Sequence, residues 1–505
     1  MVKKMNNWYR EKINEITVPN IEQDEKVPVK LEVSENFKYL KSKLNPSFDV
    51  KYRSNEVDGV KFGFVMLDGM CDNEILTEQI MIPILRGHYK ELPDGERVLE
   101  TASNNISGSI DKSIQFELNA TIREMLSGNL LMFVEGSSRA VLFGVQKFPQ
   151  RSISEPDSET QERGSKEGFS ESFKDNVALI RRRIRTPVLK TEIIEVGTTS
   201  KTRVCVAYLS DRANEETVAS VKKKIKKATF DVCLGSGYLE PFLGSEIPSL
   251  FSGVGSTERP DVLTAKLSEG KIGIITDGTP YALFVPHIFI ENFHSLDDYL
   301  KKPYYAFAIR MLKIIAFFIG IFLPGFYVAI CTFHQEVIPE TMIFDICLQE
   351  SLVPLPVMIE VLTMHTVFEI VKEAGLRMPR SIGNAVSIVG ALVIGDAAVS
   401  AGIVAAPMLI VMGMAAVSSF VIPSLYDISS LLRAVLIVVG GVSGFFGIML
   451  VFAVVVINMA SISPYKVPFT SPLSPTKTGA WRDLLFRADW RKLGTKRLQT
   501  DRLDK

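Results

Sequence analysis

The chain has 505 residues, with 57 basic and 57 acidic side chains, so its formal net charge is zero. This balance gives no reason to expect nucleic acid as a partner, because nucleic-acid-binding proteins usually carry basic surfaces. The length favours several domains, since a single hydrophobic core rarely grows beyond roughly 250–300 residues. The five cysteines are scattered without a CxxC pair, which argues against a disulfide framework or a zinc site, and no cofactor or metal is predicted.

The N-terminal region is polar. Residues 1–57 have mixed charge and weak periodicity, and we expect a polar extension made of helical fragments or disorder. The first twenty residues contain no apolar run of the kind found in signal peptides. We therefore expect the large domain that follows to stay on the cytoplasmic side of the first membrane span.

Residues 58–148 are expected to form a first α/β subdomain. Val60–Leu67 has the composition of a buried strand and is closed by an Asp-Gly turn. The other expected elements are helices at 73–85 and 116–127 and a hairpin of strands at 130–134 and 140–145. Together they predict one compact mixed unit.

A polar linker is predicted at 149–176, because almost no apolar side chain is present there to offset the cost of ordering. A basic cluster follows it, made of Arg181, Arg182, Arg183 and Arg185. Planar guanidinium groups would suit an anionic ligand or a lipid headgroup. The alternative is that these arginines form salt bridges with the acidic residues of the linker, Glu159, Glu162, Glu167 and Glu171.

Residues 177–305 are expected to form a second α/β subdomain. Its expected elements are strands at 192–196 and 204–209, a helix at 215–227, and a hairpin of strands at 271–276 and 281–285. The helix ends in the run Lys222-Lys-Lys-Ile-Lys-Lys227. Such a run either contacts anionic lipid headgroups or is simply the solvated face of a helix.

Residues 306–463 are expected to form a helical transmembrane domain. A bilayer core about 30 Å thick needs roughly 20 apolar residues in a helix. Four nearly uncharged stretches are interpreted as spans, at 314–333, 382–404, 406–423 and 434–459. The Pro324-Gly325 pair is expected to kink the first of them.

The segment 344–371 is harder to place, because it carries Glu350, Glu360, His365 and Glu369 among aliphatic residues. Cytoplasmic loops are enriched in Lys and Arg. The basic tail 464–505, with ten Lys or Arg against four Asp, should therefore lie on the same side as the N-terminal domain. Because this arrangement needs an even number of crossings, we interpret 344–371 as a re-entrant or interfacial segment.

Ionisable residues within the apolar stretches are the candidates for an ion pathway. They are Asp396, which is the only one within 382–423, together with Glu360, His365 and Glu369. An uncompensated charge in lipid costs about 3 kcal/mol even on mild insertion scales. Asp396 therefore either faces water or ions, or is a hydrogen-bonded neutral acid. His365 and Glu369 form either a structural hydrogen bond or a proton relay.

Small residues recur at helical spacing in the same region. They are Gly383, Ser387, Ala391, Gly395, Ala398 and Gly402. Close backbone approach over small side chains is what holds helices together in lipid. The stripe is expected either to pack helices of one chain or to join subunits.

Several motifs resemble those of one known family. In the membrane region they are Lys372-Glu-Ala-Gly-Leu-Arg-Met-Pro379, Ser387-Ile-Val-Gly-Ala-Leu-Val-Ile-Gly395 and Ala397-Ala-Val-Ser-Ala-Gly402. In the soluble region they are Glu155-Pro156, Arg163-Gly164, Gly168-Phe169, Asn176, Ile180-Arg-Arg-Arg-Ile-Arg185, Ser236-Gly-Tyr-Leu239, Glu258-Arg-Pro-Asp261 and Asp277-Gly-Thr-Pro280. Over roughly residues 60–490 the chain is similar to the A subunits of GerA-type spore germinant receptors.

The resemblance implies a multi-pass protein of the spore inner membrane that acts with a transporter-like B subunit and a lipoprotein C subunit. The B subunit is the usual nutrient-binding candidate, whereas the A subunit is expected to form a homo-oligomer that forms or gates an ion-conducting pathway. Position 396 departs from the family pattern, because an Asp stands where many members have Gln. An acid in place of an amide means that ion selectivity is not carried over from the family.

The expected architecture is two cytoplasmic α/β (mixed) subdomains followed by an α-helical transmembrane domain of about four spans plus a re-entrant or interfacial segment. No Walker A, GxSxG or HExxH motif is present, so no enzyme is predicted. The leading hypothesis is a nutrient-sensing A subunit whose oligomer releases monovalent cations and so triggers germination. The alternatives are a stand-alone secondary transporter, for which four spans are few, and a non-conducting membrane scaffold that recruits germination proteins.

Overall fold

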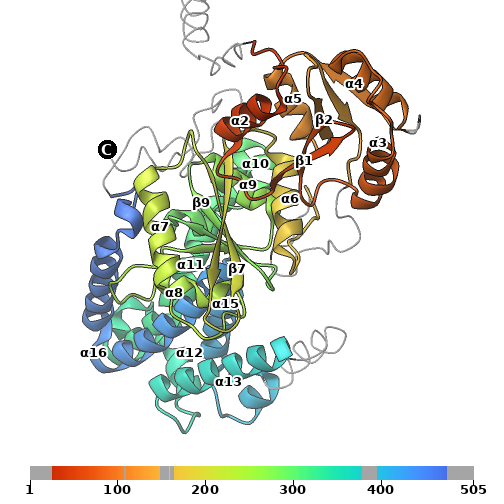
Figure 1. Cartoon of the computed structure of the whole chain (residues 1–505). Helices are drawn as coiled ribbons and strands as arrows, with labels where there is room; N and C mark the ends of the chain where they lie inside the picture. Colours follow the sequence, from red (N-terminus) through yellow and green to blue (C-terminus); the bar gives the residue numbers. More distant parts are fainter. Residues whose placement is uncertain are drawn as a thin grey trace, which may run out of the picture.

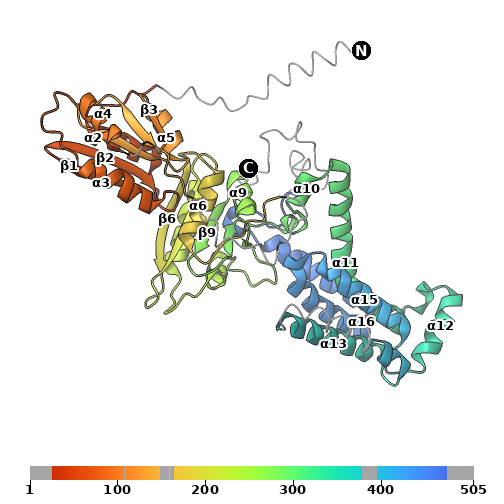
Figure 2. The same ribbon diagram turned by 90° about the vertical axis from the view of Figure 1, so that its right-hand side faces the viewer.

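The computed structural model describes residues 26–106, 108, 110–147, 159, 164–377 and 395–474. Two α/β subdomains and a helical domain follow one another in space as they do along the chain (Figure 1). Figure 2 shows the first subdomain in red to orange, the second in yellow to green, and the helices in green to blue at the far end.

The first subdomain is built on a five-stranded antiparallel sheet in the order β1-β2-β4-β5-β3. The strands are β1 (Val50–Val57), β2 (Val60–Leu67), β3 (Lys112–Gln115), β4 (Leu130–Val134) and β5 (Ala140–Phe143). Alternate side chains of β2 enter different cores, as the two-residue period of a strand requires. Phe62 and Phe64 belong to one core, whereas Val65 and Leu67 belong to the other.

Helices cover both faces of this sheet. The core with Phe62 is closed by η1 (Ile75–Met81), α3 (Ile82–Leu85) and α4 (Gly95–Asn104). The core with Val65 is closed by α2 (Val33–Leu44) and α5 (Leu118–Met125). The side chains of the three inner strands β2, β4 and β5 are therefore almost all buried.

The second subdomain repeats this plan. Its antiparallel sheet has the order β6-β7-β9-β10-β8, which matches the first sheet strand for strand. The strands are β6 (Leu189–Val196), β7 (Thr202–Leu209), β8 (Gly255–Thr257), β9 (Ile272–Thr276) and β10 (Ala282–Val285). The helices are α6 (Phe173–Arg183), α7 (Glu215–Lys227), α8 (Glu240–Leu243) and α9 (Pro260–Ser268). This structural repeat was not expected from the sequence.

The structure confirms the expected β2 strand, both expected hairpins and the helix at 215–227. It differs at the N-terminus, where the polar stretch expected at 1–57 contributes α2 and β1 to the first subdomain. The reason is that β1 is an edge strand whose side chains are mostly exposed or half-buried, so its hydrophobic signal is weak. Likewise α6 begins inside the expected linker, anchored by buried Phe169 and Phe173.

A buried ion pair joins the two subdomains. Asp49 lies just before β1, and its Oδ2 accepts a hydrogen bond of 2.7 Å from Nε of Arg181 on α6. Its Oδ1 accepts a hydrogen bond of 2.6 Å from the hydroxyl of Thr191 on β6. Burial by itself raises the pKa of Asp49, but the guanidinium charge and these hydrogen bonds hold that pKa below its ordinary value. The pair therefore ties the subdomains together as long as the carboxyl is ionised.

The helical domain consists of α11 (Pro303–Phe333), α12 (Glu340–Glu350), α13 (Val357–Arg377), α15 (Ala406–Phe420) and α16 (Tyr426–Ser461). Among the described residues, α11 and the helix Pro423–Ser461 are long and apolar enough to cross a membrane. α15 is apolar but has only 15 residues. Most of the span expected at 382–404 lies outside the described residues, and only 395–400 of it is helical here.

Helix α16 is broken at Gly444, which has φ 61° and ψ −150°. The break frees the N–H of Phe445, which donates to Nε2 of His334 at 3.4 Å. The His334 ring also stacks on Phe445, with ring centroids 4.6 Å apart. The end of α11 therefore packs into the break of α16.

An aromatic junction, made of Phe251, Phe289, Phe293, Phe317 and Phe469, connects the second subdomain to the helices. The Phe289 ring lies 5.8 Å from that of Phe317 on α11 and 6.1 Å from that of Phe469, which follows α16. The N–H of Phe289 also donates to the carbonyl of Phe469 at 3.0 Å. The chain after α16 thus returns to the second subdomain.

Candidate functional site

The candidate site is a set of polar side chains inside the helical domain, and α13 supplies three of those predicted from the sequence. Glu360 and His365 are buried and Glu369 is half-buried. Ionisable groups among apolar helices are expensive, so each needs a partner or a function. The partners of the two glutamates come from three other helices.

Glu360 lies at the start of α15. Its Oε1 accepts a hydrogen bond of 2.5 Å from the N–H of Ala405, which is the N-cap residue of that helix. The N-terminus of a helix carries unpaired N–H groups and a partial positive charge, and a carboxylate stabilises both. Glu360 therefore fixes the start of α15 against α13.

A second carboxyl group, that of Glu350 at the end of α12, lies beside Glu360. Oε1 of Glu350 accepts a hydrogen bond of 2.6 Å from the hydroxyl of Tyr327 on α11. Two neighbouring carboxyl groups repel each other unless they share a proton or a cation. This pair can therefore hold one positive charge between α12 and α13.

Glu369 faces the start of α16 instead. Its Oε1 accepts from the hydroxyl of Tyr426 at 2.9 Å and from that of Ser430 at 2.6 Å. His365, one turn earlier, is buried, and its Nδ1 has no hydrogen-bond partner in the described part of the chain. The structure shows no direct His365–Glu369 bond among the described contacts, so it supports neither of the two expected roles for that pair.

Arg433 of α16 is the central polar residue that sequence reasoning missed. It is fully buried at 0 % exposure, donates from Nε to the carbonyl of Gly320 at 2.7 Å, and donates from a terminal nitrogen to the Ser419 hydroxyl. The signal that could have found it is Pro324, because a proline lacks the N–H that would bind the carbonyl four residues earlier. Arg433 fills that position and joins α11, α15 and α16.

Asp396 does not join these residues. It is exposed on the helical stretch 395–400, and the structure records no ion pair for it within the described residues. Of the expected small-residue stripe, Gly395 is buried against Leu409. Ala398 packs on the core around Met408. Gly402 adopts φ +66° beyond the helical stretch, and the remaining members, Gly383, Ser387 and Ala391, lie outside the described residues.

A close helix crossing in the described residues uses other glycines, on α11 and α16. A Cβ added to Gly440 would lie 2.6 Å from the carbonyl oxygen of Gly325. A Cβ added to Gly325 would lie 2.9 Å from the carbonyl oxygen of Leu436. Small-residue packing in the described domain therefore holds together two helices of the same chain.

The arginines for which anion binding and salt bridges were the two alternatives are engaged within the chain. Arg181 forms the buried pair with Asp49, while Arg182 and Arg183 both contact the Glu167 carboxylate. Arg185 donates to the carbonyl of Arg182 at 3.1 Å. This geometry agrees with the salt-bridge alternative for the linker. In the described part of the chain no three His, Cys, Asp or Glu side chains are placed to hold a metal ion.

Comparison with known proteins places this geometry in context. Residues 38–499 match the family model described as Bacillus/Clostridium GerA spore germination protein. The chain is 35 % identical to spore germination protein KA of Bacillus subtilis over 475 residues, covering 93 % of this chain and 87 % of that protein. It is 33 % identical to the uncharacterized membrane protein YfkQ of Bacillus subtilis, covering 94 % of this chain and 92 % of that one.

The chain is also similar to a solved structure, that of the N-terminal domain of the A subunit of the Bacillus megaterium spore germinant receptor GerK3. The sequence identity is 29 % and the TM-score is 0.42. The match covers 52 % of this chain and 97 % of that domain.

Proposed function

This chain belongs to the GerA family of spore germination proteins, and we propose that it is the A subunit of a nutrient-sensing germinant receptor in the spore inner membrane. A role in germination follows from the family, whose model spans residues 38–499. The two long apolar helices support a membrane location. The proposed cation pathway and its gate rest on the polar residues of the helical domain.

The proposed activity is release of monovalent cations through, or under the control of, a homo-oligomer of this chain. The observation that carries it is the exposed carboxylate of Asp396, which is the only ionisable side chain between Gly395 and Phe420. A carboxylate facing lipid is costly, whereas a ring of carboxylates around a shared axis attracts cations and repels anions. We therefore propose that Asp396 lines the pathway of the oligomer.

The Glu350–Glu360 pair is proposed as the gate rather than the lining. It lies where α12, α13 and the start of α15 meet, so gaining or losing one positive charge there changes how these helices pack. His365 and Glu369 lie further along α13, the helix that also carries Glu360. A shift of α13 would move all three of its polar residues together.

The partners proposed are a transporter-like B subunit and a lipoprotein C subunit. Apolar side chains on the outer faces of the helices are available to lipid or to such a partner, among them Ile410, Val417, Phe446 and Ile457. We propose that the N-terminal subdomains and the basic tail are both cytoplasmic. This orientation requires an even number of crossings, with 344–371 re-entrant or interfacial.

A non-conducting scaffold is the second candidate, and one observation favours it. Glu360 and Glu369 both accept hydrogen bonds from neighbouring helices, which is what purely structural acids do. In that case the helices anchor the chain and the subdomains recruit other germination proteins. The two candidates differ in whether the helical domain passes ions.

Single-channel recording of the reconstituted receptor tests the proposal. We expect Asp396→Asn to reduce cation conductance and cation-over-anion selectivity, because the ring loses its charge. The matched control is Asp427→Asn, which removes another carboxylate that is 100 % exposed and should leave both quantities unchanged. Equal conductance and selectivity in wild type and Asp396→Asn, alone and with Glu360→Gln, would remove these residues from the pathway.

A further inference from the structure

A cavity of about 740 Å³ lies where the loop after α2 meets the second subdomain, and its lining is strongly basic. Five lysines contribute to it: Lys190, Lys222, Lys223, Lys226 and Lys227. The only carboxylate in the lining is that of Glu215. Asn45 and Pro46 close it from the first subdomain, so it spans both subdomains.

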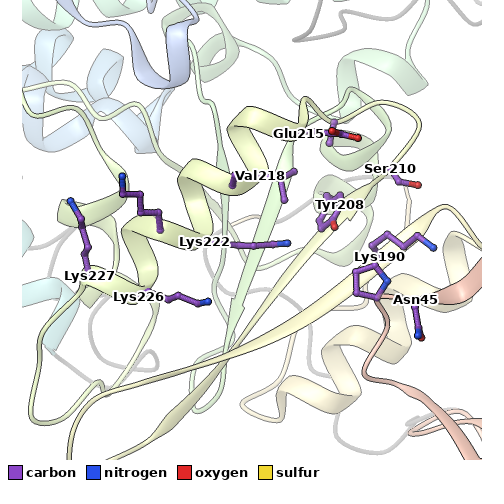
Figure 3. A pocket seen from close by; sticks show the side chains of 13 residues that line it. Asn45, Lys190, Tyr208, Ser210, Glu215, Val218, Lys222, Lys226 and Lys227 are labelled. Atoms are coloured by element: carbon purple, nitrogen blue, oxygen red, sulfur yellow. The ribbon is translucent and has the colours of Figure 1, made fainter. Parts of the chain in front are cut away.

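Figure 3 shows how the labelled lysines are arranged around this cavity. Lys222 extends from α7 toward Tyr208, with its ammonium 5.4 Å from the centre of the ring, and Lys190 approaches from the neighbouring strand. Lys226 extends from the next turn of α7. The basic groups thus reach the cavity from two different elements.

Lys190 is the residue that most requires an anion. It is only 7 % exposed, and its ammonium donates to the carbonyl of Lys43 at 2.7 Å, which carries no charge. In the described part of the chain it has no carboxylate partner, and burial followed by the nearby Arg181 charge lowers its pKa. A buried cation without a counter-charge is destabilising, and a bound anion would remove that cost.

The other charges around the cavity are only partly balanced. Lys222 pairs with Glu192 at 2.5 Å, and Glu215 adds one more negative charge. Within the described residues, no ion pair is recorded for Lys223, Lys226 or Lys227. Five ammonium groups against these two carboxylates leave a local excess of three positive charges. An anion with one charge would compensate only part of this excess.

We propose that this cavity binds a phosphate-bearing anion. A phosphate group carries close to two negative charges and several acceptor oxygens, and lysine binds it as a point charge. The apolar part of the lining, formed by Pro46, Ala213, Val218 and Ala219, suits an organic body attached to the phosphate. Because the ligand would contact both subdomains, its binding stabilises their relative orientation.

Two sources of the same chemistry are open to this site, a soluble phosphate ester and a phospholipid headgroup. Helix α7, which lines the cavity, also contacts the chain just after the last apolar helix. Tyr465 and Lys466 lie just after α16. The ammonium of Lys224 on α7 is 4.7 Å from the centre of the Tyr465 ring, and Lys466 forms an ion pair of 2.6 Å with Glu216 on α7. A headgroup at the membrane surface is therefore within reach of α7.

The first arm of the test titrates the full-length chain in a neutral detergent with glycerol phosphate, using glycerol as the uncharged control. We expect calorimetric binding that Lys190→Gln or Lys226→Gln weakens by about tenfold or more, because each removes a charge-assisted hydrogen bond. Lys226 is exposed, so its variant keeps the test informative if Lys190→Gln folds poorly. The matched control is Lys38→Gln with Lys51→Gln, two exposed lysines away from the cavity.

The second arm places the same proteins in nanodiscs of phosphatidylcholine, with or without phosphatidylglycerol, and measures acetylation of each lysine by mass spectrometry. Protection of Lys190 and Lys226 by phosphatidylglycerol alone identifies the lipid headgroup as the source. Binding of glycerol phosphate in micelles without that protection identifies a soluble ester. Failure of both arms, or binding unaffected by either cavity variant, overturns the proposal. Neither binding nor lysine acetylation depends on ion conduction, so a negative result here would not contradict the proposed function.

Discussion

Arg433 donates a hydrogen bond of 2.7 Å to the carbonyl oxygen of Gly320, one turn before Pro324 in the facing helix. Pro324 has no N–H, so this carbonyl has no helical donor. A guanidinium from α16 supplies the missing hydrogen bond and also reaches the Ser419 hydroxyl of α15. One proline therefore explains why a buried arginine is needed inside the helical domain.

Arg433→Leu should destabilise the helical domain by about 3–5 kcal/mol, because it leaves the Gly320 carbonyl unpaired and removes a buried group that holds three helices. Adding Pro324→Ala should recover part of this loss, since alanine restores the donor to that carbonyl. Thermal unfolding in detergent, followed by circular dichroism, measures both effects. Arg377→Leu, at an exposed arginine of α13, is the matched control and should unfold like wild type. No recovery in the double variant would contradict this account.

Asp49→Asn should loosen the contact between the two subdomains. The pKa of Asp49 lies below its ordinary value in the folded chain, so its contribution is fully present above about pH 4 and is lost as the pH falls through the lowered pKa. Stability of the wild type should therefore decrease on acidification in this range, and that of Asp49→Asn should decrease less. Hydrogen exchange of α6 between pH 3 and 6 (about the range where carboxyl groups titrate) measures the difference.

The control for this experiment is Asp68→Asn, which removes a more exposed carboxylate that pairs with Lys174 at 3.0 Å on the same α6. We expect a small effect, because exposed ion pairs contribute about 0–1 kcal/mol. Equal acid dependence of wild type and Asp49→Asn would show that the buried pair does not link the subdomains.

Gly440→Ala should separate α11 from α16. The added methyl would lie 2.6 Å from the Gly325 carbonyl oxygen, a backbone atom that cannot rotate away. We expect destabilisation of about 1–3 kcal/mol from this overpacking. Gly413→Ala is the matched control on α15, where a Cβ meets nothing within 4 Å, and should stabilise the helix slightly. The unfolding midpoints of the two variants should therefore shift in opposite directions, and a common shift would exclude a close crossing.

Regular elements with strong internal patterns were predictable from the sequence, and contacts between distant residues were not. The buried strand β2, both hairpins and α7 each carry a local period or a turn signal that appears within a few residues. β1 carries none, because an edge strand has little buried surface, and it is recognised only by its pairing with β2.

The candidate site shows the same limit. Glu360 and Glu369 could be identified because acids stand out in an apolar stretch, but their partners, the Ala405 N–H and the Tyr426 hydroxyl, lie 45 and 57 residues away. Arg433 lies just before the apolar stretch at 434–459, so its sequence position does not mark it as a site residue. It becomes a site residue when the packing of α11 on α16 brings it to the carbonyl that Pro324 leaves open.

Phe469→Ala should disconnect the end of α16 from the second subdomain. Phe469 is 1 % exposed and contacts both Phe251 and Phe289, so its removal leaves a cavity inside the aromatic junction. The cost for a buried phenylalanine is about 3–5 kcal/mol. The junction also contains Phe317 of α11 and so links the subdomains to the helices. We therefore expect nutrient-induced germination to decrease by more than the loss of stability alone would explain.

Hydrogen exchange across residues 462–474 and nutrient-induced germination of spores carrying the variant measure the two effects. Phe116→Ala, at an exposed phenylalanine of the first subdomain, is the control and should preserve both. Phe469→Leu should restore the exchange protection by refilling most of the volume, since its loss is mainly one of packing. If germination also returns with Phe469→Leu, apolar contact alone transmits the signal; if it does not, the ring-to-ring geometry of the junction is required. Normal germination in Phe469→Ala spores, at normal receptor levels, would rule out this junction as the coupling route.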